Sequence, residues 1–315
     1  MRFCPFVQTV GALLLLTVGV KAQENISSDT LNAIAFNPDG KVLASCSSEK
    51  VVRLWDVESG KLIRTLEGHE EAINSVHFHP NGTYLASGSD DAKVNIWDVH
   101  SGEMVHTLSS HLLRVLKVEF SSDGTFLVSG AADGQIKIWS TTDFSEVRSF
   151  SGHGGFGWIN DLALSGDGKH VISGSSEANA IVWDTSTGEQ VDNFEADRSS
   201  LLPQVLTLGF SPKNDYAVGY GAEGSIFTWE MAAKDIKRFG VPHSVHDLEF
   251  SSDGRYLVLA LDAEDQGNVM VMDFEGKTAR TLHGHIQGVR AVAFHPDGKR
   301  FATGALNGVF KIWNA

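Results

Sequence analysis

The chain has 315 residues, of which 39 are acidic and 25 are basic, so its formal net charge at pH 7 is −14. It contains no cluster of basic residues and no run in which basic and aromatic residues interleave. Such a composition argues against nucleic acid and anionic membranes as partners. The length alone would allow two domains, but the internal repetition described below favours one.

The first 22 residues differ in character from the rest of the chain. Arg2 precedes an eleven-residue apolar run at positions 10–20 (20 − 10 + 1), and the small residue Ala22 follows it. A basic start, a short apolar core and small residues before a cleavage point are typical of a secretory signal peptide, so we predict removal of residues 1–22. The run is short for a membrane span, which needs about 20 apolar residues. An uncleaved anchor and a folded part of the domain are the alternatives.

Cleavage would place the mature chain outside the cytoplasm, either secreted or periplasmic, without a membrane span. It would leave Cys46 as the sole thiol, because Cys4 lies in the removed segment. A single thiol forms no internal disulfide, so cysteine usage favours neither an oxidising nor a reducing compartment. If the N-terminus is retained, we expect a cytoplasmic protein.

A four-part unit repeats along the chain, and its clearest copy runs from Gly68 to Ser110. Four short runs of alternating apolar and polar residues, each bounded by turn-forming residues, predict a four-stranded antiparallel meander with strands a to d. Within this unit Gly82 lies fifteen residues before Trp97 (97 − 82). The same interval separates five other pairs: Gly40 and Trp55, Gly124 and Trp139, Gly168 and Trp183, Asn214 and Trp229, and Gly298 and Trp313.

One further unit completes the series. In it Gly254 precedes Met272 by eighteen residues (272 − 254), which predicts a local insertion. The spacing between successive anchors ranges from 41 residues (313 − 272) to 46 residues (229 − 183). A period of about 40 to 45 residues, marked by pairs such as Gly68-His69 and Trp97-Asp98, is typical of propeller blades.

These marks give the chain a resemblance to the WD-repeat β-propeller family from Leu31 to Trp313. The resemblance implies an all-β fold, a seven-bladed propeller of four-stranded antiparallel blades, with residues 23–315 as a single domain. The sequence stops two residues after Trp313, so the seventh blade has no strand d of its own. We expect this blade to be closed by the N-terminal segment, as in the family, or to be left incomplete.

The resemblance also implies a hydrogen-bonded network inside each blade. In it an indole donates to a hydroxyl, the hydroxyl meets an imidazole, and a polar side chain orients the imidazole. The residues at these positions are His69, Ser87, Asp91 and Trp97 in the second unit, His111, Ser129, Asp133 and Trp139 in the third, His153, Ser173, Glu177 and Trp183 in the fourth, and His285, Thr303, Asn307 and Trp313 in the seventh.

A set of Ser, His and Asp could also suggest a hydrolase. The set recurs in several units, its hydroxyl is occupied by tryptophan, and no Gly-x-Ser-x-Gly turn surrounds it. We therefore interpret it as structural and predict no catalytic residues and no enzymatic activity.

Three units lack parts of this pattern. The first keeps Ser45 and Trp55 without a histidine, the fifth has Gly219 at the hydroxyl position, and the sixth has Ala260 together with Met272 in place of tryptophan. We expect the fifth and sixth blades to be held by apolar packing alone and to open before the others.

Insertions in units four to six fall on one face of the predicted ring, the face that carries the d–a and b–c connections. These loops contain Phe156 and Trp158 among glycines, and Leu201 and Leu202. Aromatic residues in a loop ringed by polar groups are typical of a hot spot for a protein or peptide partner. The alternative is that Phe156 and Trp158 fold down on their own blades as a lid.

The sequence gives weaker support to the other candidate site residues. Arg114 and Arg290 lie near the starts of two strands a, where they could face a shared ligand or remain solvated loop charges. Short histidine and acidic groups, such as His77 with His79, lack the third ligand that a metal site needs. Motifs for phosphate, haem and dinucleotides are absent from the sequence, so we expect no cofactor and no metal.

Together these features predict an exported, non-enzymatic scaffold that binds a protein or peptide through the rim of blades four to six. One alternative is an exported propeller with a small-ligand or metal site in its central channel, including a hydrolase or lyase; Asn74, Asn160 and Asp247 are the channel-facing residues that would support it. The other is a cytosolic WD-repeat scaffold with an uncleaved N-terminus.

Overall fold

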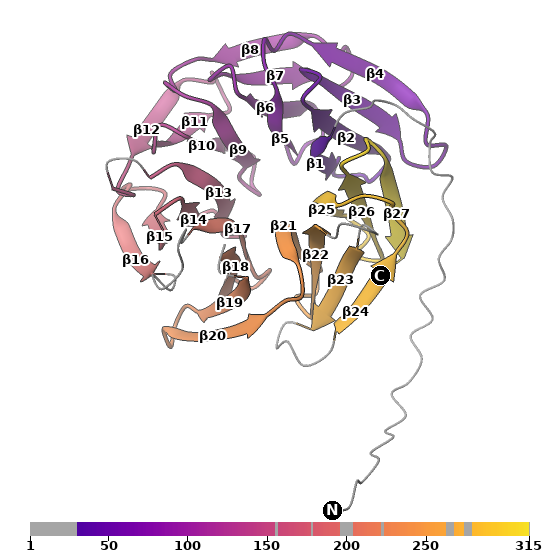
Figure 1. Cartoon of the computed structure of the whole chain (residues 1–315). Coiled ribbons are helices and arrows are strands. Elements are labelled where there is room, and N and C mark those ends of the chain that lie inside the picture. Colours follow the sequence, from indigo (N-terminus) through magenta and orange to yellow (C-terminus); the bar gives the residue numbers. More distant parts are fainter. Residues whose placement is uncertain are drawn as a thin grey trace, which may run out of the picture.

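The computed structural model describes residues 30–154, 157–177, 179–195, 204–221, 224–262, 268–273 and 279–314. In these residues the chain forms seven antiparallel sheets arranged around a central axis (Figure 1). The predicted all-β, seven-bladed propeller is therefore confirmed. No helix among the described residues has the length and apolar character needed to cross a membrane.

Each blade is built from consecutive strands that pair in chain order. In blades 1 to 3 the strands are β1 (Leu31–Phe36), β2 (Val42–Ser47), β3 (Val51–Asp56), β4 (Leu62–Glu67), β5 (Ile73–Phe78), β6 (Tyr84–Ser89), β7 (Val94–Asp98), β8 (Met104–Leu108), β9 (Val115–Phe120), β10 (Phe126–Ala131), β11 (Ile136–Ser140) and β12 (Glu146–Phe150). In blades 4 to 7 they are β13 (Ile159–Leu164), β14 (His170–Ser175), β15 (Asn179–Asp184), β16 (Gln190–Glu195), β17 (Val205–Phe210), β18 (Tyr216–Gly221), β19 (Ser225–Glu230), β20 (Asp235–Gly240), β21 (Ser244–Phe250), β22 (Tyr256–Asp262), β23 (Asn268–Asp273), β24 (Ala279–His283), β25 (Val289–Phe294), β26 (Arg300–Ala305) and β27 (Phe310–Asn314).

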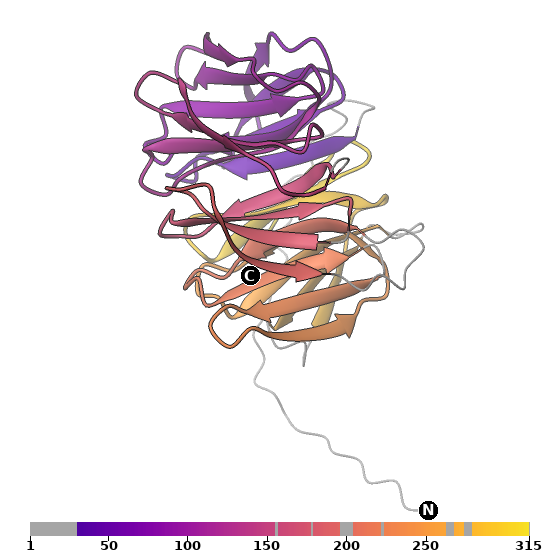
Figure 2. The ribbon, with the colours of Figure 1, turned by 90° about the vertical axis from the view of Figure 1, so that its left-hand side faces the viewer.

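The first strand of every blade lies nearest the axis, and the fourth lies on the outside (Figure 1). Seen from the side, the twisted sheets stand next to one another around the ring (Figure 2). Among the described residues blade 7 has three strands, β25 to β27. The predicted signal peptide and the N-terminal segment expected to close this blade lie outside the described residues.

The hydrophobic core lies between neighbouring blades. One cluster joins Leu54 of blade 1 to Ile73 and Trp97 of blade 2, and all three side chains are buried. The close packing depends on small residues in strand b: a Cβ added to Gly88 would lie 2.7 Å from Val115 of the next blade. Because a sheet with two wet faces is not stable alone, each blade needs its neighbours.

The ring closes through contacts between blade 7 and blade 1. Leu31 and Ile34 of β1 pack in one cluster with Phe310 and other residues of blade 7. His295 Nε2 donates a hydrogen bond to the carbonyl oxygen of Gly40 at 3.0 Å, while its Nδ1 accepts from the backbone of Asp297. Gly40 has φ of 73°, and a Cβ at that position would meet the His295 ring, so only glycine fits.

The strands around the axis share a local irregularity. In all seven blades the pairing of strand a with strand b shifts by one residue near the start of strand a. A β-bulge of this kind re-aims side chains, because an extra residue breaks the strict alternation of faces. The seven bulge residues form a ring that borders a central channel of about 630 Å³: Asn32, Asn74, Leu116, Asn160, Leu206, His246 and Arg290.

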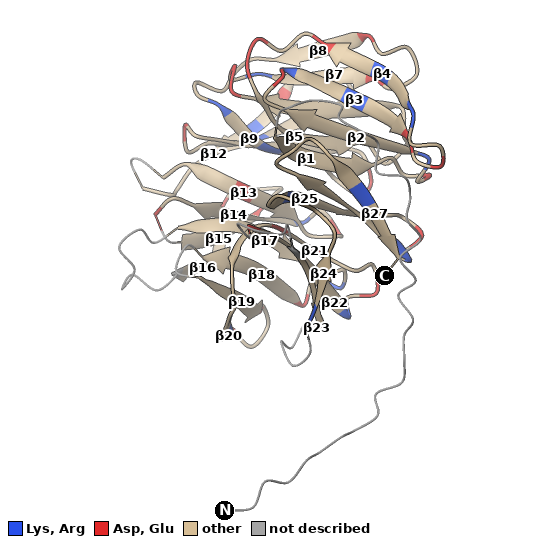
Figure 3. Ribbon diagram, turned by 45° about the vertical axis from the view of Figure 1, so that its right-hand side comes forward, with Lys and Arg blue, Asp and Glu red and all other residues tan. Residues whose placement is uncertain are grey.

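Charge on the outside of the molecule is mixed in sign. Lysine and arginine alternate with aspartate and glutamate along the outer strands and turns of blade 1 (Figure 3). Ion pairs there, such as Lys41 with Asp39 and Arg53 with Glu49, join neighbouring residues.

Candidate functional site

The polar network is present in blades 2 and 3 with nearly equal geometry. In blade 2 the indole Nε1 of Trp97 donates to Ser87 Oγ at 2.8 Å, and Ser87 Oγ lies 2.8 Å from His69 Nε2. His69 Nδ1 lies 2.8 Å from Asp91 Oδ2. Because the carboxylate can only accept, the ring proton lies on Nδ1, and since burial lowers the pKa of His69 and keeps the ring neutral, Nε2 accepts from the Ser87 hydroxyl.

Blade 3 repeats this arrangement. Trp139 Nε1 donates to Ser129 Oγ at 2.9 Å, His111 Nε2 lies 2.7 Å from that oxygen, and His111 Nδ1 lies 3.1 Å from Asp133 Oδ2. Both serine side chains, Ser87 and Ser129, are fully buried. A substrate cannot reach either hydroxyl, so these sets hold the blade together and perform no hydrolysis.

Blades 4 and 7 depart from the predicted network at the residue that orients the histidine. His153 Nδ1 pairs with Asn179 Oδ1 at 2.6 Å, so the prediction of Glu177 in this role is wrong. Glu177 instead lies against Gly154, where an added Cβ would meet its carboxylate. The other contacts of blade 4 follow the pattern, since Ser173 Oγ lies 2.6 Å from His153 Nε2 and accepts from Trp183.

In blade 7 the prediction of Asn307 as the partner of His285 is also wrong. Thr303 Oγ1 accepts from Trp313 and meets His285 Nε2, both at 2.7 Å. The other ring nitrogen, Nδ1, is buried without a hydrogen-bond partner among the described residues, and Asn307 accepts instead from the backbone of Val309. Burial and the nearby Lys311 lower the pKa of His285 to about 3, so the ring is neutral.

The network also shapes the surface. We call the side of the ring that carries the d–a and b–c connections the top face. There the carboxylate of Asp133 accepts a hydrogen bond from the backbone N–H of Leu112 at 2.8 Å, and Asp91 accepts from Glu70 at 3.0 Å. In blades 2 and 3, the d–a connection that leads into the blade is thus held by the b–c turn of that same blade. The residue after the network histidine is presented to solvent on a fixed backbone.

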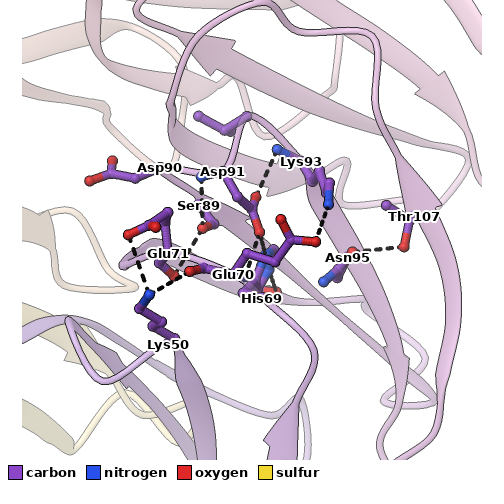
Figure 4. A network of polar contacts seen from close by, with 12 residues as sticks. Lys50, His69, Glu70, Glu71, Ser89, Asp90, Asp91, Lys93, Asn95 and Thr107 are labelled. Carbon is purple, nitrogen blue, oxygen red and sulfur yellow. Dashed lines mark hydrogen bonds and ion pairs between the residues drawn. The ribbon is translucent and has the colours of Figure 1, made fainter.

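On blade 2 this position is charged and already paired. Glu70 lies 3.0 Å from Lys93, and Glu71 lies 3.5 Å from Lys50 of blade 1 (Figure 4). On blades 3 and 7 the same position carries an apolar side chain, because Leu112 is 83% exposed and Ile286 is 73% exposed. These exposed residues were not predicted, although their place after the histidine of each repeat could have indicated them.

The two loops that flank blades 3 and 4 come together on this face. The guanidinium carbon of Arg114 lies 4.6 Å from the ring centroid of Trp158, a cation–π contact. Trp158 keeps 43% of its surface exposed, and Leu113 next to Arg114 keeps 50%. The Trp158 N–H donates to Ser176 Oγ and the Ser176 N–H donates to the Trp158 carbonyl oxygen, which holds the loop in place. We call Leu112, Leu113, Arg114 and Trp158 the apolar patch.

The remaining predicted contact residues are Phe156, Leu201, Leu202 and Arg290. Phe156, Leu201 and Leu202 lie outside the described residues. Arg290 is a bulge residue of β25, on another side of the ring from β9 (Figure 1), and its guanidinium donates to His246 Nδ1 at 3.2 Å. A shared ligand for Arg114 and Arg290 is therefore not supported.

Comparison with known proteins agrees with this architecture. A family profile described as the second beta-propeller of echinoderm microtubule-associated protein matches residues 31–200, which is more than half of the chain. A second profile, the WD domain or G-beta repeat, matches residues 276–314. The chain belongs to the WD-repeat β-propeller family.

Curated relatives match only over one or two repeats. The nuclear distribution protein PAC1-2 of Uncinocarpus reesii is 50% identical over 44 residues, which cover 14% of this chain and 10% of the relative. The general transcriptional corepressor TUP1 of Saccharomyces cerevisiae is 41% identical over 14% of this chain and 6% of its own length. The human intraflagellar transport protein 122 homolog is 32% identical over 29% of this chain and 6% of its own length. The matched segments thus span a tenth of these relatives or less.

Proposed function

We propose that this protein is a non-enzymatic interaction scaffold that binds a protein or peptide partner on its top face. The observation that carries the proposal is the apolar patch, in which Trp158 and Arg114 stack at 4.6 Å beside two exposed leucines. Tryptophan and arginine are the residues most enriched at binding hot spots, because they bury large surfaces with limited loss of conformational freedom. The proposed footprint also takes in the rim of blades 4 to 6, to which the sequence assigns Phe156, Leu201 and Leu202.

Two further points support a scaffold. The serine–histidine–aspartate sets are buried structural networks, which removes the most obvious catalytic candidates. The relatives carry roles in nuclear distribution, transcriptional corepression and intraflagellar transport, and the segments that they share with this chain amount to a tenth of their length or less. Shared repeats with unlike roles favour a common binding architecture and name no partner.

The proposal includes export. The pattern of residues 1–22 supports a signal peptide cleaved after Ala22, so the mature protein is proposed to begin at Gln23 in an extracytoplasmic compartment. Edman sequencing of the protein recovered from each compartment tests this point. Intact Met1 on the active cellular pool would show that the scaffold works in the cytoplasm instead.

The binding surface is tested by comparing partner recovery between wild type and variants in crosslinking followed by affinity purification. Trp158→Ala combined with Arg114→Ala is expected to reduce recovery of specific partners at least about tenfold, as loss of hot-spot residues does. Val147→Ala combined with Val191→Ala is the control, because both residues are exposed apolar side chains on outer strands. Equal recovery by wild type and the Trp158 variant would rule out the apolar patch.

A further inference from the structure

The central channel contains polar groups that neither the blade network nor the apolar patch uses. Below the bulge ring, the next-to-last residue of each strand a borders the cavity. Three of these residues are polar, His77, Glu119 and Glu249, and the other four are small. The small residues are Ala35, Ala163, Gly209 and Ala293. They leave open space around the polar ones at a single level of the channel, which we call the lower ring.

Each polar residue of the lower ring is anchored by one atom only. Glu119 Oε2 accepts from the backbone of Leu164 at 3.2 Å, and Glu249 Oε2 accepts from the backbone of Phe294 at 2.7 Å. His77 Nδ1 accepts from the backbone of Phe120 at 3.1 Å, which leaves the ring proton on Nε2.

The opposite atoms of these side chains are not used. Within the described part of the chain, Oε1 of Glu119, Oε1 of Glu249 and Nε2 of His77 make no hydrogen bond with protein. None of the three belongs to the buried polar atoms that lack a partner, so they are accessible from the channel. The backbone of the next blade thus fixes each side chain while two acceptors and one donor remain for a ligand.

Acidic side chains outnumber lysine and arginine in the channel. One level above the lower ring, Asp161 and Asp247 add two carboxylates, and Lys117 is the cation of that level, with its Nζ 2.9 Å from Asp161 Oδ1. Asp161 and Asp247 also accept from the backbone N–H groups of Leu208 and Val292. Four carboxylates therefore face one lysine, and the guanidinium of Arg290 at the bulge ring is directed at His246.

The pKa values of the two glutamates are raised in this environment. Burial raises the pKa of Glu119 to about 7, against the opposing effect of Lys117, and burial raises the pKa of Glu249 to about 8. Charge in this cavity is therefore not fully stabilised by the protein itself. A cation placed between the glutamates would supply the missing stabilisation.

The geometry points to a binding site for a small organic cation in the lower ring, with a guanidinium or primary ammonium group held between Glu119 and Glu249. Such a group carries several N–H donors for a carboxylate, and a molecule with a cationic group at each end can pair with both glutamates, whose charges interact across the channel. A metal ion fits less well, because no cluster of three or more metal-ligating side chains exists among the described residues. The alanines of the ring provide apolar contact for an aliphatic stem attached to the cationic group.

The test is titration calorimetry of the full-length protein with agmatine, which carries a guanidinium and an ammonium group on a short stem. We expect saturable 1:1 binding. We also expect affinity at least about tenfold weaker in Glu119→Gln and in Glu249→Gln, because each loses a charge-assisted hydrogen bond. Glutamine keeps an oxygen that can accept the backbone N–H, so both variants are expected to fold, and circular dichroism with thermal melting verifies this.

A matched control distinguishes binding at this site from general electrostatic attraction to an acidic protein. Asp39→Asn combined with Asp167→Asn removes two carboxylates from exposed a–b turns, 54% and 42% exposed, and should leave agmatine affinity unchanged. A peptide with a central arginine in the same titration distinguishes a partner's side chain, if it binds more tightly than agmatine, from a free ligand.

Three results would overturn the proposal. These are no agmatine binding at millimolar concentration, equal affinity in wild type and the glutamine variants, or equal weakening in the Asp39 and Asp167 control. Binding of Mg²⁺ or Ca²⁺ that disappears in Glu119→Gln would replace the organic cation with a metal.

Discussion

Blades 2 and 5 hold their third strand in two different ways. In blade 2 the indole of Trp97 is tied by Ser87 and His69 to Asp91, and every polar atom of the chain of contacts is paired. In blade 5 the hydroxyl position is Gly219, and the ring of Phe227 fills the space: a Cβ on Gly219 would lie 2.3 Å from it.

Both tryptophans are nevertheless buried to the same degree, since Trp97 and Trp229 are each 1% exposed. Phe227 packs on Phe194 with ring centroids 4.5 Å apart, so blade 5 replaces hydrogen bonds with aromatic contact. In these two blades the third-strand tryptophan fills the core, and the polar network is one of two ways to fill the space beside it. What the network adds is a fixed d–a connection on the top face.

The largest expected effect is the loss of the shared element. Trp97→Ala should lower the free energy of unfolding by about 3–5 kcal/mol, because it removes a fully buried indole and leaves a cavity. Urea unfolding followed by circular dichroism measures this change. An unchanged melting temperature would contradict a structural role for the indole.

The next prediction concerns the strand b hydroxyl, which blade 2 has and blade 5 lacks. Ser87→Ala should cost about 1–3 kcal/mol, because it leaves the donor of Trp97 and the acceptor of His69 buried without a partner. Gly219→Ser, which adds the hydroxyl that blade 5 lacks, should also destabilise by about 1–3 kcal/mol because the side chain collides with Phe227. Urea unfolding of both variants decides the matter, and a stabilised Gly219→Ser would show that blade 5 can accept the network.

A smaller effect concerns Glu119 and Glu249, which occupy the same position in a networked blade and in an apolar one. Their pKa values rise from an ordinary 4.5 to about 7 and about 8, mainly through burial. The folded protein thus binds more protons than the unfolded chain between these values. Stability is therefore greatest near pH 4.5 for this pair and falls as the pH rises towards 8.

The pKa values of the two glutamates also depend on neighbouring charges, since Lys117 lowers both, Asp161 raises that of Glu119 and Asp247 raises that of Glu249. Unfolding in urea between pH 5 and 8 should show the decline in wild type and a flatter profile in Glu119→Gln/Glu249→Gln. Parallel profiles in the two proteins would refute the assignment. Agmatine at saturation should reduce the decline, because it stabilises the ionised pair.

The smallest effect is in local opening. Blades 5 and 6 lack the complete network, so amides of β18 and β22 should exchange with solvent before those of β6 and β10, with opening free energies lower by about 1 kcal/mol. Hydrogen exchange with mass spectrometry resolves the four strands. Earlier exchange in β6 than in β18 would reverse the comparison.

The blade count was predictable from sequence because turn residues and anchors recur at one spacing. Gly82 and Trp97 stand on either side of strand b. The first makes a tight turn with positive φ, as Asn214 does in blade 5, and the second fills the core, as Met272 does in blade 6. The network was predictable where residue types matched, as at His69 and Ser87. The prediction failed at Glu177 and Asn307, which stand where blades 2 and 3 have aspartate. The extra methylene of glutamate, or the amide of asparagine, changes which group the side chain reaches.

The lower ring and the carboxylates above it were not predicted. Asn74, Asn160 and Asp247 were assigned to the channel, whereas Asp161 and Glu119 were missed. Strict alternation would place neighbours such as Asn160 and Asp161 on opposite faces, but the bulge at the start of each strand a brings both to the channel. A bulge leaves little trace in the hydrophobic pattern. The exposed Leu112 was missed for another reason, because it replaces a charged residue in a loop of ordinary length.

The contact between His295 and Gly40 spans 255 positions of the chain, and it has a consequence for biosynthesis. Strand order around the ring follows the order of translation, so the last interface unites the first strands made with the last. Until β25 emerges from the ribosome, Leu31 and Ile34 lack the half of their core cluster that blade 7 supplies and stay exposed to chaperones on that side. A nascent chain that lacks its final repeat is therefore an open ring with an uncovered apolar surface at each end. Cellular quality control can distinguish this exposed surface from the closed ring.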